Sequence, residues 1–292
     1  MKRLLTLITL LITAFQTIAS ITESGQGMIF GKDHAFTIKA DSGWVLDNES
    51  GVNQGLHMVF YPKEFTWKNS PVISYGRTIT STNGETIKSQ VQYTINDFRK
   101  NGSPKYVGEH NKDITLDNGK VVSIYLYSGD KWGNYEAVAY VQEAETINFL
   151  VYNSRNKEQF DKNLGAFYAM AESYENRYNP SNLTIDEIDL LTKKADGFLV
   201  VDGGKDYETK ATQFNGQLMS NSLQQCTSFV KSNEDISFSY FVEIDSKGNI
   251  KNSSITPTNA LTTCFNGLMS QASYPINNFE DFMLKVSVTV TK

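Results

Sequence analysis

The hydrophobic residues in the first half of the chain change their period, and this change limits the fold more than any other feature. Between residues 25 and 178 apolar and polar residues mostly alternate, as in "VISYGRTIT", where Ile73, Tyr75 and Ile79 share one side. Such alternation is typical of strands with one buried face. Two segments, 82–101 and 157–175, show helical spacing instead. Because strands joined by short turns pair in antiparallel fashion, we expect an antiparallel sheet with two helices packed on it.

Both helical segments have a distinct apolar face. Thr82 and Glu85 have the spacing of a capping box, so the first helix is expected to begin beside them. The second follows the last predicted strand. The residues expected to face the sheet are Ile87, Val91, Ile95 and Phe98 in the first helix and Phe160, Leu164, Phe167, Ala171 and Tyr174 in the second.

The second half of the chain has a different order of elements. A helical stripe in 216–231 is followed by two alternating segments around the turn "DSKGN", a second helix near 260–270 and a final alternating strand. This order predicts a small α-β-β-α-β domain. The apolar stripes are Met219, Leu223, Cys226 and Val230 in the first helix, Leu261, Cys264, Phe265, Leu268 and Met269 in the second, Phe238, Tyr240, Val242 and Ile244 in the first strand, and Phe282, Leu284, Val286, Val288 and Val290 in the last.

The chain is therefore predicted to be of the α+β class with two domains. A length of 292 residues also exceeds that of one typical domain. The predicted divisions are a signal peptide at 1–20, a first domain at 21–178, a linker at 179–200 with room for a short helix, and a second domain at 201–292.

The first twenty residues have the layout of a secretory signal peptide. Lys2 and Arg3 precede an apolar run over residues 4–15, and small or polar residues follow, with cleavage expected after Ala19 or Ser20. An uncleaved membrane anchor is the alternative, but the run is shorter than the ~20 residues that a spanning helix needs. We therefore expect a periplasmic or secreted protein, with no transmembrane segment after cleavage.

The charge of the chain argues against nucleic acid as a partner. Loss of Lys2 and Arg3 with the leader, which holds no acidic residue, changes the formal charge from −5 to −7. No basic cluster stands elsewhere in the sequence, and binding to phosphates depends on clustered Lys and Arg. The same balance disfavours docking on an anionic membrane surface.

The first half resembles the PsbP-like family of α/β/α sandwiches over residues 27–176. The resemblance lies in "FTIKADSGWVLD", where a strand runs into Gly43 and Trp44, in the strand "GLHMVFYP" that follows, and in the closing helix. Many members have Pro before the Gly-Trp pair, where this chain has Asp41 and Ser42. The resemblance implies a docking module rather than an enzyme.

The second half, over residues 215–292, resembles the TonB C-terminal-like domains of the AgmX/PglI C-terminal type. The matching elements are a helix with Cys226, the hairpin "VEIDSKGNI", a helix with Cys264, "YPI" at 274–276, and an apolar final strand. This resemblance implies an envelope interaction domain. The energy-transducing role of TonB itself is not expected, because it needs a retained anchor and a Pro-rich spacer, and the six prolines here are scattered.

The only two cysteines, Cys226 and Cys264, both lie on predicted inward faces of their helices. In an exported chain such a pair is expected to form a disulfide. Reduced core thiols are the first alternative, and a redox or metal site is the second. The redox site would need a reactive thiolate, often in a C-x-x-C, and the metal site would need three or four ligands at short spacing.

The sequence contains none of several local signatures of enzymes. G-x-S-x-G, H-E-x-x-H, the Walker A loop and the G-x-G-x-x-G fingerprint are all missing. "GEHNKD" is expected to be a polar strand end or loop, and the alternative is a metal role for His110 with Glu109 and Asp113. We predict no catalytic residue, no metal ligand and no cofactor.

Three aromatic residues are candidate contacts for a partner. Phe65 and Trp67 stand in a predicted loop, and Trp132 stands at a predicted hairpin tip. Exposed aromatic side chains are frequent at binding sites. The alternative is that the loop folds back and buries its rings against the sheet edge.

The expected function is that of an exported, non-enzymatic envelope protein that binds another envelope protein. The alternative is a periplasmic enzyme of hydrolase type, or a small-molecule binder, with its site assembled across the strands of the first domain.

Overall fold

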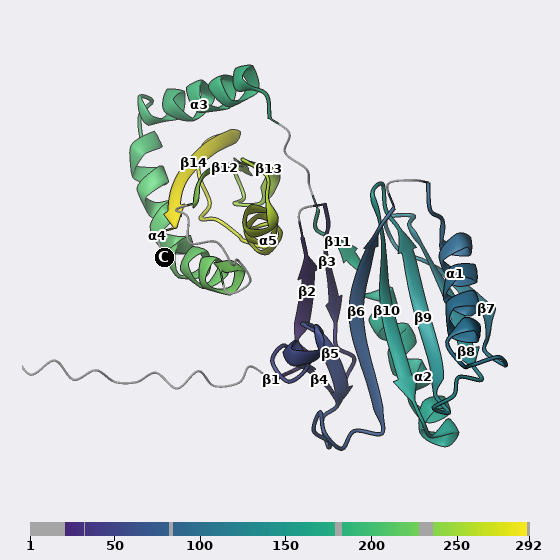
Figure 1. Ribbon diagram of the computed structural model, residues 1–292. Coiled ribbons are helices and arrows are strands. Elements are labelled where there is room, and N and C mark those ends of the chain that lie inside the picture. Colours follow the sequence, from purple (N-terminus) through teal and green to yellow (C-terminus); the bar gives the residue numbers. More distant parts are fainter. Residues whose placement is uncertain (1–20, 32, 82–83, 179–182, 228–235, 291–292) are drawn as a thin grey trace, which may run out of the picture.

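Antiparallel strands form the framework of both halves of the chain (Figure 1). The computed structural model describes residues 21–31, 33–81, 84–178, 183–227 and 236–290. The expected signal peptide and residues 179–182 of the expected linker lie outside the described residues. The chain is of the α+β class, with helices packed on two separate sheet systems.

An eight-stranded antiparallel sheet is the centre of the first half. Its middle strands are buried on both faces, so each face needs a cover. The strands lie in the spatial order β1 (Ile21–Glu23), β4 (Trp44–Asp47), β5 (Val59–Pro62), β6 (Val72–Thr80), β10 (Thr146–Ser154), β9 (Tyr135–Gln142), β8 (Val121–Ser128) and β7 (Val107–Thr115).

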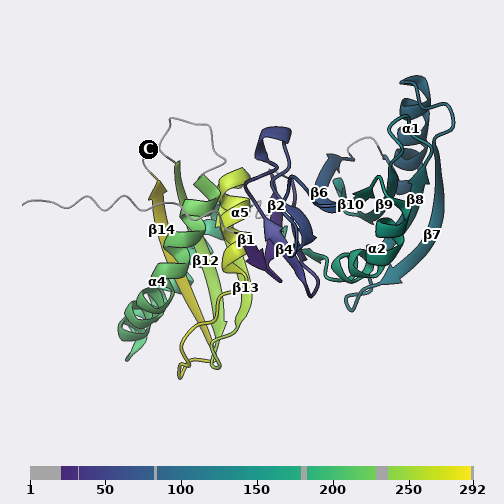
Figure 2. The same ribbon diagram turned by 90° about the horizontal axis from the view of Figure 1, so that it is seen from below.

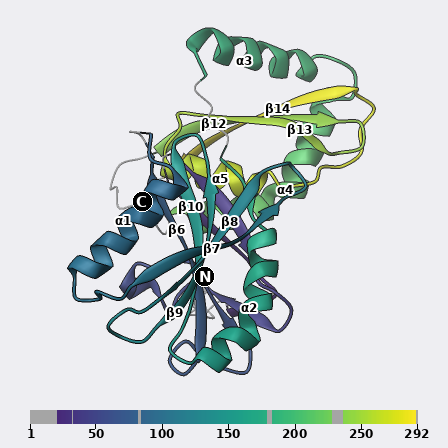
Figure 3. The same ribbon diagram turned by 90° about the vertical axis from the view of Figure 1, so that its right-hand side faces the viewer.

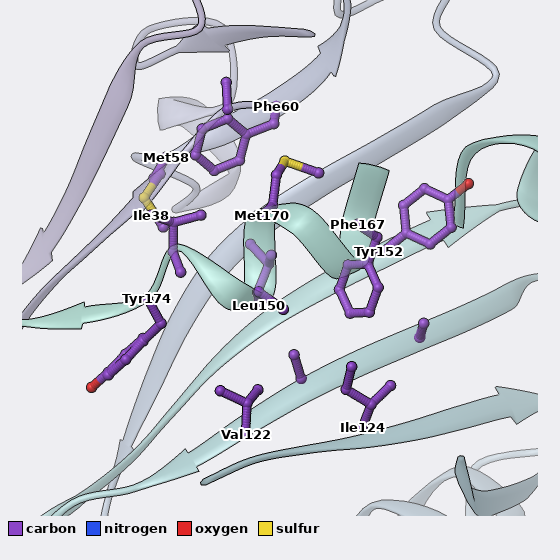
Figure 4. Packing of buried hydrophobic residues seen from close by; sticks show 14 of the residues in the cluster. Ile38, Met58, Phe60, Val122, Ile124, Leu150, Tyr152, Phe167, Met170 and Tyr174 are labelled. Atoms are coloured by element: carbon purple, nitrogen blue, oxygen red, sulfur yellow. The ribbon is translucent and has the colours of Figure 1, made fainter. Parts of the chain in front are cut away.

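One face is covered by helix α2 (Lys157–Glu172) together with a three-stranded sheet of β2 (Gln26–Phe30), β3 (Ala35–Lys39) and β11 (Glu175–Asn176). The resulting core is shown in Figure 4, where Phe167 and Met170 of α2 lie above the sheet beside Leu150. The predicted inward face of this helix is confirmed, because Phe160, Phe167, Ala171 and Tyr174 are buried and Leu164 packs against them.

The other face is partly covered by α1 (Ile87–Lys100), which packs Val91 and Ile95 against β9 and β10. The predicted cap of this helix is wrong. Thr86 is the N-cap, its Oγ accepting from Ser89 N at 3.2 Å, and Ser89 Oγ accepting from Thr86 N at 2.8 Å. Gly84 has φ of 78°, a left-handed conformation that a helix starting at Thr82 could not contain. Thr82 itself lies outside the described residues.

The second half forms a three-stranded sheet with helices on both faces. Its strands are β12 (Ile236–Asp245) in the centre, with β13 (Ile250–Thr256) and β14 (Asp281–Val290) at the edges. Helices α4 (Gly204–Thr227) and α5 (Ala260–Met269) cover one face, and α3 (Ile185–Leu199) covers the other (Figure 3). The predicted inward stripes of β12, β14 and α5 all lie in the core under α4 and α5. Val230, predicted for the stripe of the first helix, lies outside the described residues.

Two helices are longer than their sequence predictions. The expected linker, which had room for a short helix, contains the 15-residue helix α3, whose Ala195 packs on Phe241 and Met283 of the small sheet. Helix α4 begins at Gly204, twelve residues before the predicted stripe. Its first turns are fixed by contacts from far along the sequence, because Tyr207 Oη donates to Pro275 O at 2.8 Å and Asn215 Nδ2 donates to Ser273 O at 3.0 Å.

A disulfide joins Cys226 of α4 to Cys264 of α5, with 5.7 Å between their Cα atoms. Both residues are buried in the second core. The bridge closes a loop of 38 residues of sequence separation, and it holds together the two helices that cover the same sheet face.

The two halves meet where α5 lies beside β2 and β3 (Figure 2). A Cβ added at Gly267 of α5 would stand 2.9 Å from Met28 Cε, so only glycine permits this approach without a shift of Met28. Phe30, at the end of β2, packs against the core of the second half.

We predict that the Cys226→Ala/Cys264→Ala double variant is less stable by about 4 kcal/mol, because the unfolded chain regains the entropy that the closed loop removes. Denaturant unfolding followed by far-UV circular dichroism measures the difference. The control is the unsubstituted chain with a reductant, which should unfold near the midpoint of the variant. Equal midpoints for the unsubstituted chain with and without reductant would contradict a disulfide that stabilises the fold.

Candidate functional site

The candidate site lies at one end of the eight-stranded sheet, on the face that α1 shares with two loops. At this end β6 and β9 begin while β8 and β10 finish (Figure 1). The strand register brings Ile73, Asn153, Glu136 and Tyr127 into one row across β6, β10, β9 and β8. Segments distant in sequence therefore place apolar, amide, acidic and phenolic side chains next to one another.

A pocket of about 420 Å³ opens at the β6 end of this row. Its size falls within the range of small-molecule sites. The apolar part of its wall comes from Trp67, Pro71 and Ile73. The polar part comes from residues of three segments, namely Gln54, Ser70, Asn153, Arg155 and Asn156.

Asp47 fixes the loop that reaches the pocket from β4. Its Oδ1 accepts from the backbone N–H of Glu49 at 2.9 Å and of Ser50 at 2.8 Å, and its Oδ2 accepts from Tyr61 Oη at 2.8 Å. Burial alone would raise the pKa of Asp47, but these hydrogen bonds lower it below its usual value. The loop carrying η1 (Val52–Gln54) is thus held by an ionised carboxylate at neutral pH.

The structure places the predicted contact residues Phe65 and Trp67 in the loop between β5 and β6, both half-buried. The Trp67 ring packs on a cluster that includes Val59 and Tyr61. Trp67 therefore lines the pocket and is also partly exposed at the surface. A role for Phe65 or Trp67 in binding a partner protein stays a prediction.

Trp132 differs from Trp67, because 53% of its surface is exposed. It stands on the tip of the hairpin between β8 and β9, as the sequence indicated. Asp130 shapes the tip by accepting from the N–H groups of Trp132 at 3.1 Å and Asn134 at 2.8 Å. The Lys131 ammonium lies 4.5 Å from the Trp132 ring centroid and donates to Asn101 O at 3.0 Å, which ties the tip to the end of α1.

A series of aromatic rings leads from this tip into the sheet. Trp132 meets the ring of Phe98 edge-on at 6.4 Å, Phe98 stacks on Tyr106 at 4.2 Å, and Tyr106 stacks on Tyr127 at 5.6 Å. Aromatic pairs at such separations stabilise one another beyond the area that they bury. The exposed indole therefore lies at the outer end of a packed column of rings, which limits the orientations open to it.

Glu136 is a functional candidate that the sequence analysis missed. Burial raises its pKa to about 7, with a contribution from the charge of Asp130, while hydrogen bonding to Asn153 and the charge of Arg77 oppose the rise. The signal was present in "YEAVAYVQ", since Glu136 alternates in phase with Val138 and Tyr140 on the α1 face. An acid that titrates near neutral pH can exchange a proton there, and such groups concentrate at functional sites.

Other chemical possibilities find less support in the structure. His110 Nε2 pairs with Asp113 Oδ1 at 2.9 Å on the exposed strand β7, and the described residues contain no group of three His, Cys, Asp or Glu side chains placed to hold a metal. Ser128 with Lys131 and Ser154 with Lys157 have the S-x-x-K spacing of some serine hydrolases. The Lys131 ammonium is engaged by Asn101 and Trp132, and the Lys157 ammonium by Asp161. No helix within the described residues is both long and apolar enough to cross a bilayer.

Comparison with known proteins finds likeness in solved structures only. No protein-family model matches the chain, and no curated protein does. A cyanobacterial PsbP (CyanoP) from Synechocystis sp. PCC 6803 is similar with 12% identity and a TM-score of 0.35, covering 56% of this chain and 98% of that one. The Saccharomyces cerevisiae Ran-binding protein Mog1p has 13% identity and a TM-score of 0.34, covering 52% and 96%. A Bacteroides thetaiotaomicron protein has 11% identity and a TM-score of 0.31, covering 66% and 64%.

A PsbP is thus among the similar structures, as the resemblance of residues 27–176 suggested. The identities are too low to transfer a partner or an activity. The function proposed below is therefore based on the residues of this chain.

We predict that Glu136→Gln gains stability relative to the unsubstituted chain as the pH rises. The folded chain holds the Glu136 proton up to about pH 7, whereas an ordinary glutamic acid loses it near 4.5, so the contribution of Glu136 to stability is complete below 4.5 and is lost as the pH rises to about 7. The amide lacks this titration. The stability of the variant minus that of the parent should rise by about 2 kcal/mol between pH 5 and pH 8, measured by urea unfolding. A difference independent of pH would show that the carboxyl titrates normally.

Proposed function

We propose that the chain is an exported, non-enzymatic envelope protein whose first half docks on another envelope protein through the Trp132 tip. The single observation that carries this proposal is a half-exposed indole that contacts the ring of Phe98 edge-on and lies beside the ammonium of Lys131. An indole that is both exposed and fixed loses little conformational freedom when a partner covers it.

The chemistry of the tip suits a protein partner. Tryptophan is the residue most enriched among those that dominate binding energy at protein interfaces, because it buries a large apolar area and keeps one N–H donor. Lys131 and Asp130 beside it supply the charged rim that such sites have. A partner with an apolar hollow bordered by polar groups would fit this tip.

Two features support export. Residues 1–20 have the composition of a leader, and the Cys226–Cys264 disulfide is of a kind that persists in oxidising compartments. The order α4-β12-β13-α5-β14 agrees with the resemblance of residues 215–292 to the TonB C-terminal-like domains. On this proposal the second half is an envelope interaction domain as well.

Small-molecule binding by the first half is a second candidate function, and it is favoured by the pocket beside Trp67. It does not compete with docking at Trp132, because the two features lie over different strands of the sheet.

We predict that a photoreactive residue placed at Asn101, next to the Trp132 tip, forms one adduct of defined mass in intact cells. The adduct should fall roughly tenfold or more in Trp132→Ala, because removal of a dominant interface residue costs at least about 2 kcal/mol. Trp132→Phe should retain most of it. Gel mobility and mass spectrometry of the purified adduct provide the measurement.

The matched control is the same photoreactive residue at Glu158, which is exposed on α2 over the opposite face of the sheet. No adduct is expected from that position. The docking proposal would be refuted if the Asn101 adduct survived Trp132→Ala unchanged, or if no adduct formed at Asn101.

A further inference from the structure

We infer that the pocket between Trp67 and Arg155 binds a carboxylate that carries an apolar or aromatic group. Two sources share this chemistry: the free C-terminus of a polypeptide that ends in an apolar residue, and a small aromatic or aliphatic acid. The inference stands apart from docking at Trp132, since no residue of the pocket belongs to that hairpin.

The apolar part of the pocket packs on a buried cluster. Trp67 packs on the buried cluster of Val59 and Tyr61, and Tyr61 is itself held by Asp47. Ile73 belongs to β6 and packs against the same cluster. An aromatic ring or a branched side chain placed against Trp67 and Ile73 would lose its contact with water without forcing the pocket to rearrange.

Arg155 gives the pocket its charge preference. It is the only charged side chain among the described residues that line the pocket, and no ion pair within the described part of the chain engages it. A guanidinium presents paired N–H donors that match the two oxygens of a carboxylate. A negatively charged ligand would thus meet a cation that makes no competing ion pair.

Neighbouring amides add donors rather than further charge. Asn156 is the N-cap of α2, where its Oδ1 accepts from Gln159 N at 3.0 Å, and within the described residues its amide N–H groups have no acceptor. Ser70 Oγ is committed to Val72 O. The polar wall can therefore donate to the second oxygen of a bound carboxylate. A ligand that carries a neutral amide instead of the carboxylate would lose the charge interaction with Arg155.

The pocket is open on the side formed by Gln54, Arg155 and Asn156, which are exposed. This opening allows a polypeptide to leave the pocket after its last residue has entered, and it also admits a free acid. A polypeptide can make further contacts outside the pocket, whereas a small acid cannot. Comparing the affinities of a peptide and a small acid therefore distinguishes the two ligands.

The test is a titration of tryptophan fluorescence in the full exported chain carrying Trp132→Phe, in which the change on binding reports Trp67, because Trp44 is buried away from the pocket and adds a constant signal. The probes are N-acetyl-L-phenylalanine, its C-terminal amide, and a hexapeptide ending in Phe as free acid and as amide. Each acid is expected to bind roughly tenfold or more tightly than its amide, and Arg155→Gln should remove this preference.

The matched control is Lys162→Gln, which removes an exposed cation of α2 that does not line the pocket and should leave affinity unchanged. A hexapeptide acid that binds much more tightly than N-acetylphenylalanine identifies a polypeptide C-terminus as the source, and equal affinities identify a small acid. The inference is overturned if neither acid binds at millimolar concentration, if acids and amides bind equally, or if Arg155→Gln binds the acids as well as its parent.

Discussion

The burial of both faces of the eight-stranded sheet is the constraint on which the rest of the first half depends. Strands β9 and β10 carry apolar residues on both sides, so neither face can be left to water. Helix α2 and the sheet of β2, β3 and β11 cover one face completely enough to form a single large core. Among the described elements, α1 is the helix that covers the other face, with 14 residues and a length of about 21 Å. Loops must cover what α1 leaves, over β4, β5 and β6.

This incomplete cover explains where both proposed binding features lie. The pocket opens where the loops with Gln54 and Trp67 meet the ends of β6 and β10. Trp132 extends beyond the same end of the sheet, where Phe98 and Lys131 connect the hairpin to the last turn of α1. Between them Glu136 lies in one strand row with Asn153, a residue of the pocket wall, and with Tyr127, a ring of the aromatic column.

The sequence predicted the elements whose patterns are local. The α+β class, the inward faces of α2 and α5, the alternation of β12 and β14 and the pairing of Cys226 with Cys264 follow from periodicity and from two inward cysteines. The sequence did not predict the start of α4, because that start is set by contacts of Tyr207 and Asn215 with residues near Pro275. It also did not predict the packing of α3 on Phe241. The alternation of "YEAVAYVQ" could have placed Glu136 on the α1 face, but not the pocket or the strand row that Glu136 shares with Asn153. Both depend on which strands are neighbours and in which register they pair. Among the predicted contact residues, Trp132 is the one whose position followed from the local turn sequence alone, since Asp130 shapes the hairpin tip.

Export into an oxidising compartment is the claim on which the docking role and the disulfide both depend. The most direct measurement is the intact mass of the exported protein, taken under denaturing conditions with an alkylating reagent and without reductant. The expected mass is that of a chain cleaved after Ala19 or Ser20 with no alkyl group added, since Cys226 and Cys264 are joined. A chain that retains its first twenty residues would contradict cleavage and export in soluble form, and two added alkyl groups would contradict the disulfide.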